Sequence, residues 1–438
     1  MFFSKIGKKQ YKKKINAFCF GLAMYQSFII LLAVALLFTL INKRILKLQL
    51  TIGLMIMGMM MSATLLLVRE FAPQWFAHLL HLVENIDFES FLMNGILSFL
   101  LFAGSIHINV EALKKERLPV FMFSILGTII STFVIGYLTF VLFGLLGWSI
   151  PLVHCLLFGA LISPTDPIAV LAIFKDYKVR EDISIKIEGE SLFNDGIGIV
   201  LFLTVSQLAG SQSGDLSFWS VSLLFLREAV GGILFGVLIG YVATWLLKVF
   251  KSDAEGAILV TLVVATSGYA VALVMGLSGA LAMVAAGLVV GSYINKHAGQ
   301  EVREMTGSFW KILDSVFNSV LFVLMGLVIL LIDPAVISFE AAAFVVLIVL
   351  FARFVSVAIP YLLVDKRVTG FPWFNPRIVT IMTWSGLRGG LAFALALSVD
   401  VNNHGHFFIF LTYSVVAFSI IVQGLTIGQM VKKLGVSR

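Results

Sequence analysis

The chain has 438 residues, of which 60% are hydrophobic and only 13% charged, and its formal net charge is +7. Soluble globular proteins carry roughly 25% charged residues, so this composition, with a mean hydropathy of +1.03, excludes a soluble fold and indicates a polytopic membrane protein. In such a protein the positive charge marks cytoplasmic loops and argues against a nucleic-acid partner. Cys19 and Cys155 lie apart in apolar stretches and indicate neither a disulfide nor a metal site.

The apolar stretches, at about 20 residues for each membrane crossing, predict thirteen membrane-spanning helices. They lie near residues 17–41, 49–68, 89–109, 118–147, 152–174, 184–208, 217–249, 255–275, 278–294, 309–332, 336–364, 376–399 and 406–431. We therefore predict an all-α polytopic membrane protein in which residues 1–438 form one transmembrane domain, and we expect no soluble regulatory domain.

Lysine and arginine gather in alternate loops, and this pattern predicts the orientation of the chain. The basic loops hold Lys43, Arg44, Lys47, Lys114, Lys115, Arg117, Lys175, Lys178, Arg180, Lys248, Lys251, Lys296, Arg303, Lys366, Arg367 and Arg377. The alternate loops hold Glu84, Asp87, Asp215, Asp333 and Asp400. Because basic loops face the cytoplasm, we expect the C-terminus, with Lys432 and Lys433, to be cytoplasmic as well.

The N-terminal end conflicts with this orientation. Thirteen spans with a cytoplasmic C-terminus place the N-terminus outside, but lysines crowd residues 5–14. Because the alternation of many loops outweighs one tail, our hypothesis is that the native chain begins at Met24 and has a shorter first span. The alternative is a first segment that does not cross conventionally. Intact-mass analysis of the natively expressed protein tests the hypothesis, and a full-length mass would refute it.

Two predicted spans are interrupted by residues that break helices. The fifth carries Pro164 and Pro167 on either side of Thr165 and Asp166, and the twelfth carries the run from Ser385 to Gly390. Interrupted segments in corresponding positions of the two halves are typical of secondary transporters built from inverted repeats, whose ion site lies near the bilayer midplane. Irregular backbone is tolerated at that depth only where it lines a cavity or is buried in protein.

Acidic residues within these spans indicate an ion or proton pathway. A carboxylate inside a bilayer is costly, so Asp166 and Asp195 are functional candidates by default. Ser191 and Asp195 are four residues apart and share a helix face, whereas Glu190 lies roughly 140° around the helix from Asp195. Glu190 therefore needs a different partner, and the embedded arginines Arg353 and Arg388 are the candidates for a buried pair.

The oxygen atoms of the fifth and sixth spans suit a hard monovalent cation. Pro164 and Pro167 remove backbone donors and free carbonyl groups, Thr165 adds a hydroxyl and Asp166 a carboxylate. Burial disfavours the charged form of a carboxylate, and a proton and a sodium ion cannot both occupy Asp195. A carrier that alternates access only when Asp195 is neutralised therefore exchanges the two ions. The neighbouring Asn194 cannot carry a second charge, which favours electroneutral one-for-one exchange.

At this point the residues resemble a known family. Thr165-Asp166-Pro167, followed by Glu190-Ser191-x-x-Asn194-Asp195, is similar to the signature of the NhaP-type sodium/proton antiporters of the monovalent cation:proton antiporter-1 family, which are related to the eukaryotic sodium/proton exchangers. Further matches are Leu101–Gly104, Ala282–Gly287, Phe309–Leu313, Trp384–Gly390 and Val422–Thr426. They follow the family order and cover essentially the whole chain after about residue 24.

The resemblance implies inverted repeats with two discontinuous, crossed helices, and a core domain that moves against a dimerisation domain. We expect core helices over about 89–208, 309–399 and part of 406–431, with the remainder as dimer or scaffold helices. The resemblance also implies glycine packing across a dimer for the ladder Gly232, Gly236 and Gly240, which by itself indicates only a close helix contact.

The same resemblance implies the roles of the site residues. Asp195 would bind the cation or the proton, and Na⁺ or K⁺ would lie at Asp195, Ser191 and Thr165. Asp166 and Asn194 are expected to be further ion-binding residues. Glu190 would pair with Arg353, and Arg388 would support the crossed helices together with Pro164 and Pro167. One departure is that some relatives carry an acid beside the glycine of the third span, where this chain has Ala103. A third-helix ligand and the preference for sodium over potassium therefore stay open.

These observations predict a secondary antiporter that exchanges Na⁺, or K⁺ or Li⁺, for H⁺ across the plasma (inner) membrane. We expect a lipid-embedded homodimer that works in cation and pH homeostasis, with no enzymatic activity and no cofactor. His404 and His406, beside Asp400, are candidates for modulating the response to pH. A cation channel is an alternative. An intramembrane aspartyl protease would need two acids sharing a proton, but its Tyr-Asp and Gly-x-Gly-Asp signatures are missing around Asp166 and Asp195.

Overall fold

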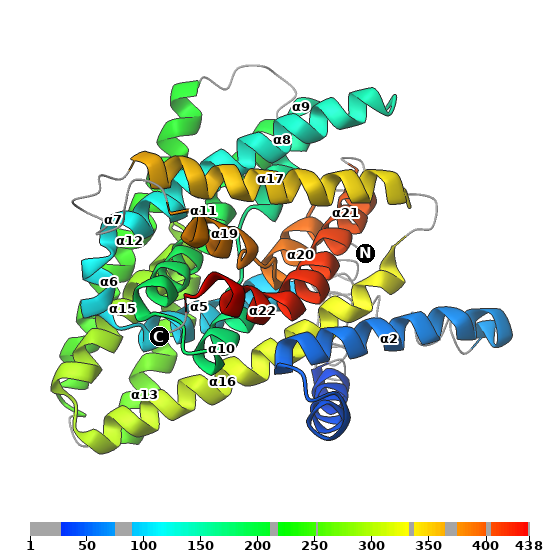
Figure 1. Cartoon of the computed structure of the whole chain (residues 1–438). Helices are drawn as coiled ribbons and strands as arrows, with labels where there is room; N and C mark the ends of the chain where they lie inside the picture. The colour runs from blue at the N-terminus through cyan, green and yellow to red at the C-terminus, as the bar shows by residue number, and fades with distance from the viewer. Residues whose placement is uncertain are drawn as a thin grey trace, which may run out of the picture.

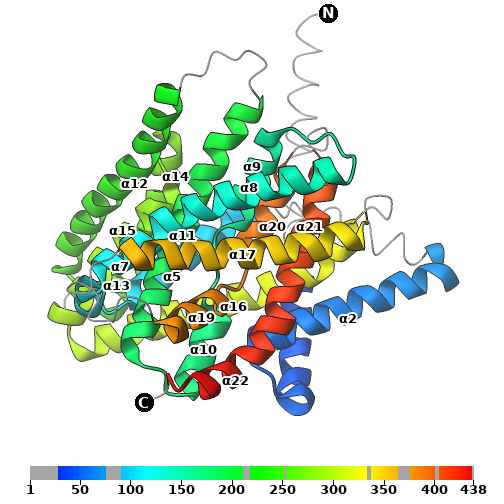
Figure 2. The same ribbon diagram turned by 45° about the horizontal axis from the view of Figure 1, so that its top comes forward.

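The computed structural model describes residues 28–74, 90–210, 218–250, 253–332, 337–363, 375–399 and 404–436. Within these ranges the fold is a bundle of helices without strands (Figures 1 and 2). The lysine-rich tail with Met24 lies outside the described residues. So do the acids of the alternate loops, namely Glu84, Asp87, Asp215, Asp333 and Asp400.

Ten helices of the described part are long and apolar enough to cross a membrane. They are Phe28–Leu46, Leu50–Arg69, Arg117–Leu145, Glu181–Gly210, Ser222–Leu247, Ala254–Val274, Gly279–His297, Gln300–Leu330, Phe339–Leu363 and Gly405–Leu434. The all-α, membrane-spanning class predicted from the sequence is therefore confirmed. The other three predicted spans correspond to shorter helices, so the count of thirteen stays a prediction.

The individual elements have the following bounds. In chain order they are η1 (Asn42–Leu46), α2 (Leu50–Phe71), η2 (Phe91–Ile96), α5 (Leu97–His107), α6 (Val110–Lys115), α7 (Arg117–Phe121), η3 (Met122–Leu126), α8 (Gly127–Leu145), α9 (Leu152–Ile162), α10 (Ile168–Asp176), α11 (Glu181–Gly210), α12 (Phe218–Leu247), α13 (Ala254–Val263), η4 (Val264–Gly268), α14 (Tyr269–Val274), α15 (Gly279–His297), α16 (Gln300–Leu327), η5 (Val328–Leu331), α17 (Phe339–Leu363), α19 (Pro376–Trp384), α20 (Gly390–Leu397), α21 (Gly405–Phe418), η8 (Ser419–Gln423) and α22 (Gly424–Leu434).

Short polar side chains define where several helices begin. Asn109 accepts hydrogen bonds from the backbone N–H groups of α6, and Asp253 does the same for α13. Asn375 caps α19, whose first residue is Pro376. Such caps satisfy N–H groups that have no partner inside the helix, and proline is tolerated there because it lacks that group.

The helices pack in two groups. In one group α15 contacts α12 and α5, and α16 contacts α2, α5 and α13. In the other α8 contacts α9 and α17, α9 contacts α11, and α17 contacts α19 and α21. The two interrupted spans, α9 with α10 and α19 with α20, belong to the second group. Figure 1 shows α19 and α20 in the middle of the bundle, between α17 and α16.

The glycine ladder on α12 packs within the protomer. A Cβ atom at Gly232 would lie 2.6 Å from the carbonyl oxygen of Ser278, and one at Gly236 would overlap the carbonyl oxygen of Ala282. A Cβ atom at Gly240 would lie 2.9 Å from Cβ of Val289. The expectation that this ladder packs across a dimer is therefore wrong, because small residues of α15 already fill the glycine face.

We predict that Gly236→Leu destabilises the protomer by about 1–3 kcal/mol, because the added side chain forces α12 and α15 apart. The measurement is the apparent melting temperature of the detergent-solubilised protein, followed by size-exclusion chromatography. Val242→Leu is the control, since Val242 lies on the same helix and is 51% exposed. An unchanged melting temperature with a changed oligomeric state would instead place the ladder at a dimer contact.

Candidate functional site

The two interrupted spans cross and hold each other through backbone groups. The backbone N–H of Asp166 donates to the carbonyl oxygen of Leu387 at 2.8 Å. A Cβ atom at Gly389 would lie 2.6 Å from Cβ of Asp166, so only glycine permits this approach. The unwound backbone of each span thus supplies a hydrogen-bond partner to the other, as irregular backbone within a membrane-spanning bundle requires.

Arg388 binds the carbonyl groups that end α9. Its Nη1 donates to the carbonyl oxygen of Ser163 and, at 3.0 Å, to that of Pro164. The side chain is only 2% exposed. The C-terminal end of a helix carries unsatisfied carbonyl groups and a partial negative charge, so the guanidinium group neutralises the break in the fifth span. This geometry fits the supporting role expected for Arg388.

Ser191 and Asn194 hold the broken fifth span against α11. Ser191 Oγ donates to the carbonyl oxygen of Thr165, and Asn194 Nδ2 donates to Thr165 Oγ1 at 2.8 Å. Thr165, Ser191 and Asn194 are all at most 5% exposed. The hydroxyl oxygens of Thr165 and Ser191 therefore have fixed positions, and the hydrogen bond from Asn194 orients the Thr165 side chain.

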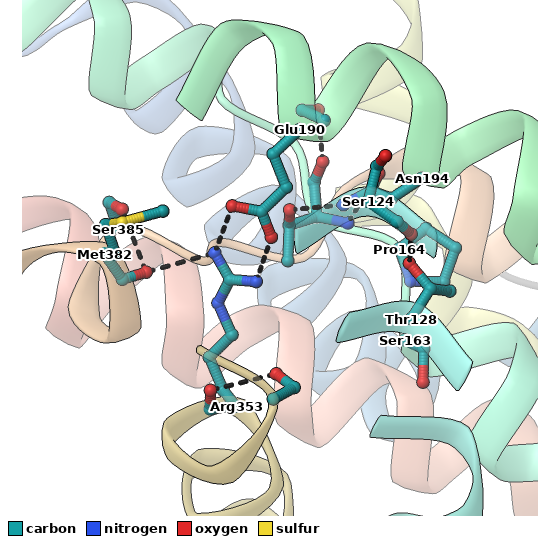
Figure 3. Close-up of polar contacts among 12 residues, drawn as sticks. Ser124, Thr128, Ser163, Pro164, Glu190, Asn194, Arg353, Met382 and Ser385 are labelled. Atoms are coloured by element: carbon teal, nitrogen blue, oxygen red, sulfur yellow. Dashed lines mark hydrogen bonds and ion pairs between the residues drawn. The ribbon is translucent and has the colours of Figure 1, made fainter. Parts of the chain in front are cut away.

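Glu190 and Arg353 form a buried ion pair with two contacts (Figure 3). Arg353 Nη1 donates to Glu190 Oε1, and Nη2 donates to Oε2 at 3.1 Å. Nη2 also donates to the carbonyl oxygen of Met382 at 3.1 Å. The two side chains are 2% and 6% exposed, so the pair joins α11, α17 and α19 inside the bundle.

A cavity of about 460 Å³ lies beside the crossing. Its polar lining is His107, Thr165, Asp166, Glu188, Ser191, Asp195, Lys311, Asp314 and Asn318. Pro164, Pro167, Ala103 and Gly104 also line it, so the third span faces the cavity without an acid. Of the predicted ion-binding residues, Asp195, Asp166, Thr165 and Ser191 therefore come together at one cavity. Asn194 is not in the described lining, and its role as an ion ligand stays a prediction.

The cavity extends toward the side of the basic loops. His107 ends α5, Glu188 lies in the second turn of α11 and Lys311 lies in the first half of α16, and all three line it. Toward the opposite side Leu92, Leu321 and Ala394 form an apolar cluster in which each residue is at most 5% exposed. Asp166 and Asp195 thus lie in a cavity that is blocked by apolar side chains on one side.

Asp166 and Asp195 differ in their partners. Asp166 Oδ1 accepts the backbone N–H of Ile168, at 2.9 Å, where α10 begins. In the described part of the chain, Asp195 has no hydrogen-bond donor and neither acid has a basic side chain within ion-pair distance. The described residues also contain no group of three His, Cys, Asp or Glu side chains arranged to hold a metal ion. A cation here would need hydroxyl or carbonyl ligands, and an uncompensated buried carboxylate requires a proton or a cation.

Several lining residues were not predicted from the sequence. Glu188 lies three residues before Ser191 and seven before Asp195, so helical periodicity alone could have placed it on their face. Asp314 and Asn318 are four residues apart on α16 and directly follow the Phe309–Leu313 motif. His404 lies away from the cavity, with its ring centroid 5.6 Å from that of His154. The proposed influence of His404 and His406 on the pH response stays a prediction.

We predict that Glu190→Gln or Arg353→Ala strongly lowers the folded yield, because removing one partner leaves a buried charge uncompensated, a change that typically costs about 3–5 kcal/mol. The measurement is the amount of monodisperse protein after solubilisation. Glu111→Gln is the control, since Glu111 and Lys296 form an exposed pair at 3.0 Å, a kind of contact that contributes little. Normal yields for both buried variants would refute the stabilising role of the pair.

Known proteins are similar to this chain in sequence and in fold. The family described as "Sodium/hydrogen exchanger, transmembrane" matches residues 31–433. The Na⁺/H⁺ antiporter NhaP of Pseudomonas aeruginosa is 36% identical over 407 residues, which cover 92% of this chain and 95% of that protein. The Na⁺/H⁺ antiporter NhaH of Halobacillus aidingensis is 32% identical over 416 residues, covering 93% and 98%.

A solved structure supports the same relationship at the level of the fold. The sodium proton antiporter MjNhaP1 from Methanocaldococcus jannaschii at pH 8 matches with a TM-score of 0.71 at 19% identity, over 95% of this chain and 99% of that one. The resemblance seen in the sequence motifs is thereby confirmed. The chain belongs to the sodium/hydrogen exchanger family of transmembrane proteins.

Proposed function

We propose that this protein exchanges Na⁺, or K⁺ or Li⁺, for H⁺ across the membrane that it spans. The observation that carries the proposal is the pair of acids, Asp166 and Asp195, which line one cavity beside the crossed helices and, among the described residues, have no basic side chain within ion-pair distance. Thr165 and Ser191, which carry hydroxyl oxygens, line the same cavity. Family membership and the printed names of the relatives, which are Na⁺/H⁺ antiporters, support the same reaction.

Asp195 is the carboxylate that would bind either ion. Asp166 is stabilised as an anion by the N–H of Ile168 at the start of α10, whereas Asp195 has no such donor among the described residues. A buried carboxylate without a donor favours its neutral or ion-bound form. Proton and cation therefore compete for Asp195. The protein would change between its inward-facing and outward-facing states only when one of them has neutralised this carboxylate.

The hydroxyl groups are arranged to bind a cation. Ser191 donates its hydroxyl hydrogen to the carbonyl oxygen of Thr165, and Thr165 Oγ1 accepts from Asn194. The remaining lone pair of Ser191 Oγ is thus free to face a cation beside Asp195. The Asn194 amide adds no charge to this set, which supports an electroneutral exchange of one cation for one proton.

The cavity lies between the two packing groups, which suggests how access alternates. Its walls are α5 and α16 on one side and the α9–α10 break, α11 and the start of α20 on the other. We infer that α8–α11 and α17–α22 form the mobile core, and that α5 and α16 belong to the scaffold. This division differs from the expected core over about 89–208 and 309–399, because α5 and α16 pack mainly with α15 and α2.

The wider setting of the protein is part of the same proposal. Large apolar side chains on the outside of the helices, including Trp219, Leu234 and Trp245 of α12, suit contact with lipid. We infer a homodimer in the plasma (inner) membrane, with the basic loops and the C-terminus in the cytoplasm, that transports ions for cation and pH homeostasis. Transport without enzymatic chemistry or a cofactor is sufficient for this role. Family membership favours it over the channel and protease alternatives.

We predict that Asp195→Asn reduces cation-dependent proton flux to the level of protein-free liposomes. The reason is that a neutral amide cannot release a proton in exchange for a cation. The measurement uses proteoliposomes with a preset pH gradient and follows its collapse after sodium, potassium or lithium is added. Asp176→Asn, the same change at an exposed acid near the end of α10, is the control and should transport like the wild type.

Two outcomes would contradict the proposal. Wild-type rates for Asp195→Asn would remove that residue from the mechanism. Cation flux in the wild type that needs no counter-moving proton would favour the channel instead.

We further predict that a membrane potential leaves the sodium/proton balance point unchanged, since one positive charge moves in each direction. The measurement clamps the potential of sodium-loaded proteoliposomes and locates the sodium gradient at which proton flux vanishes. Movement of one net charge would shift this balance by about 2.3 kcal/mol per 100 mV. A shift of that size would refute the one-for-one stoichiometry and leave the exchange itself standing.

A further inference from the structure

A third aspartate, Asp314 of α16, lines the cavity that contains Asp166 and Asp195. It lies on the wall formed by α5 and α16, opposite the broken spans and α11. In the described part of the chain no basic side chain lies within ion-pair distance of it. Lys311, one turn earlier on the same helix, is exposed and forms no ion pair with Asp314. Asp314 is therefore a further partly buried carboxylate with no ion-pair partner among the described residues.

Asn318 supplies a second oxygen atom beside Asp314. Its Nδ2 donates to Asp314 Oδ1 at 2.9 Å, and this hydrogen bond fixes the orientation of both the carboxylate and the amide. Asn318 is 3% exposed and lines the same cavity, and its Oδ1 is buried without a hydrogen-bond donor. A buried acceptor without a partner is uncommon and costs free energy. Asn318 Oδ1 has almost no accessible surface in this conformer, so a turn of the amide toward the cavity would let a cation, or a water molecule of its hydration shell, satisfy this oxygen.

Apart from His107 and Lys311, the other described residues that line this wall are apolar or glycine. Leu97, Leu100 and Leu101 of α5 are apolar, and the residues nearest the broken spans are Ala103 and Gly104. The three aspartates also do not form one compact metal site, since the described residues contain no such group of three acids. Asp314 and Asn318, which are hydrogen-bonded to each other, are thus a pair of oxygen ligands on α16, whereas Asp195 lies on α11 across the cavity.

We propose that Asp314 and Asn318 form a second cation site, which binds the transported cation from the open side of the cavity and delivers it to Asp195. This inference rests on the proposed exchange. The ligands are a carboxylate oxygen, an amide oxygen and water, a set that suits a partly hydrated monovalent cation. Because α16 belongs to the other packing group, movement of the core would carry Asp195 away from this site, which would then affect how well the cation competes with the proton from this side only.

The first test separates affinity from turnover. In proteoliposomes oriented with the basic-loop side outward, Asp314→Asn should raise the apparent KM for sodium about tenfold, as expected for the loss of one ionic contact, and change the maximal rate less than twofold. Asn318→Leu, of similar volume, should raise KM in the same direction. Asp314→Glu should restore KM toward the wild type, and Asp176→Asn is the matched control.

The second test needs no transport. Sodium should raise the melting temperature of Asp195→Asn in detergent, because a ligand that binds the folded state stabilises it. The double variant Asp195→Asn/Asp314→Asn should lose this response. Choline chloride at equal ionic strength is the control for a general salt effect.

The outcomes separate this inference from the proposed function. An unchanged KM in Asp314→Asn, or a fall in maximal rate alone, would overturn the second site while leaving the exchange intact. If Asp314→Asn does not fold, Asp314→Glu and Asn318→Leu carry the same measurement, and wild-type KM in Asn318→Leu would count against the site. If the wild type exchanges no cation, the exchange fails, but a sodium-dependent melting shift that requires Asp314 would still establish the site.

Discussion

The structure depends on how two broken helices are satisfied inside a membrane. Unwinding the backbone at the bilayer midplane leaves carbonyl and N–H groups that lipid cannot hydrogen-bond. Here Arg388 binds the carbonyl groups at the end of α9, and the N–H of Asp166 binds the carbonyl of Leu387. Each helix break is therefore stabilised by hydrogen bonds from the other. This mutual dependence explains why the crossing lies in the middle of the bundle.

A second constraint is the distribution of buried charge. Glu190 and Arg353 compensate each other away from the cavity, and their pair holds α11 against α17 and α19. One helix therefore carries a paired acid on one face and, five residues later, an unpaired acid on another. The paired acid serves the packing of the bundle, which leaves Asp195 free to respond to ions in the cavity. The two roles cannot be exchanged without leaving Arg353 uncompensated.

Much of this arrangement could be predicted because it depends on local chemistry. Pro164, Pro167 and the glycines near Arg388 disfavour a continuous helix, so the sequence locates both interruptions. Helical spacing places Glu190 and Asp195 on different faces. The membrane-spanning all-α class followed from hydropathy, and the family from the order of its motifs.

The features that could not be predicted depend on which helix faces pack against each other in the folded bundle. Glycines at intervals of four residues indicate that another backbone approaches, but not whether it belongs to the same chain, and Gly236 faces α15 of its own protomer. Asp314 lies on a helix with several other charged residues, where an acid is ordinary until the packed bundle shows that its face lines a cavity. The hydrogen bonds of Asn194 to Thr165 could not be predicted from sequence spacing alone, and its role as an ion ligand stays a prediction.

The contacts of Thr165 have a consequence for the energetics of the whole cycle. Ser191 and Asn194 hold it against the helix that carries Asp195, so the oxygen atoms of the proposed site form one rigid unit. A unit that is carried intact offers the cation the same coordination at either surface of the bilayer. Equal affinity in two states biases neither of them. The Asp195 site itself would therefore favour neither the inward-facing nor the outward-facing state, and any difference in affinity between the two sides would come from residues outside this unit, such as Asp314 and Asn318.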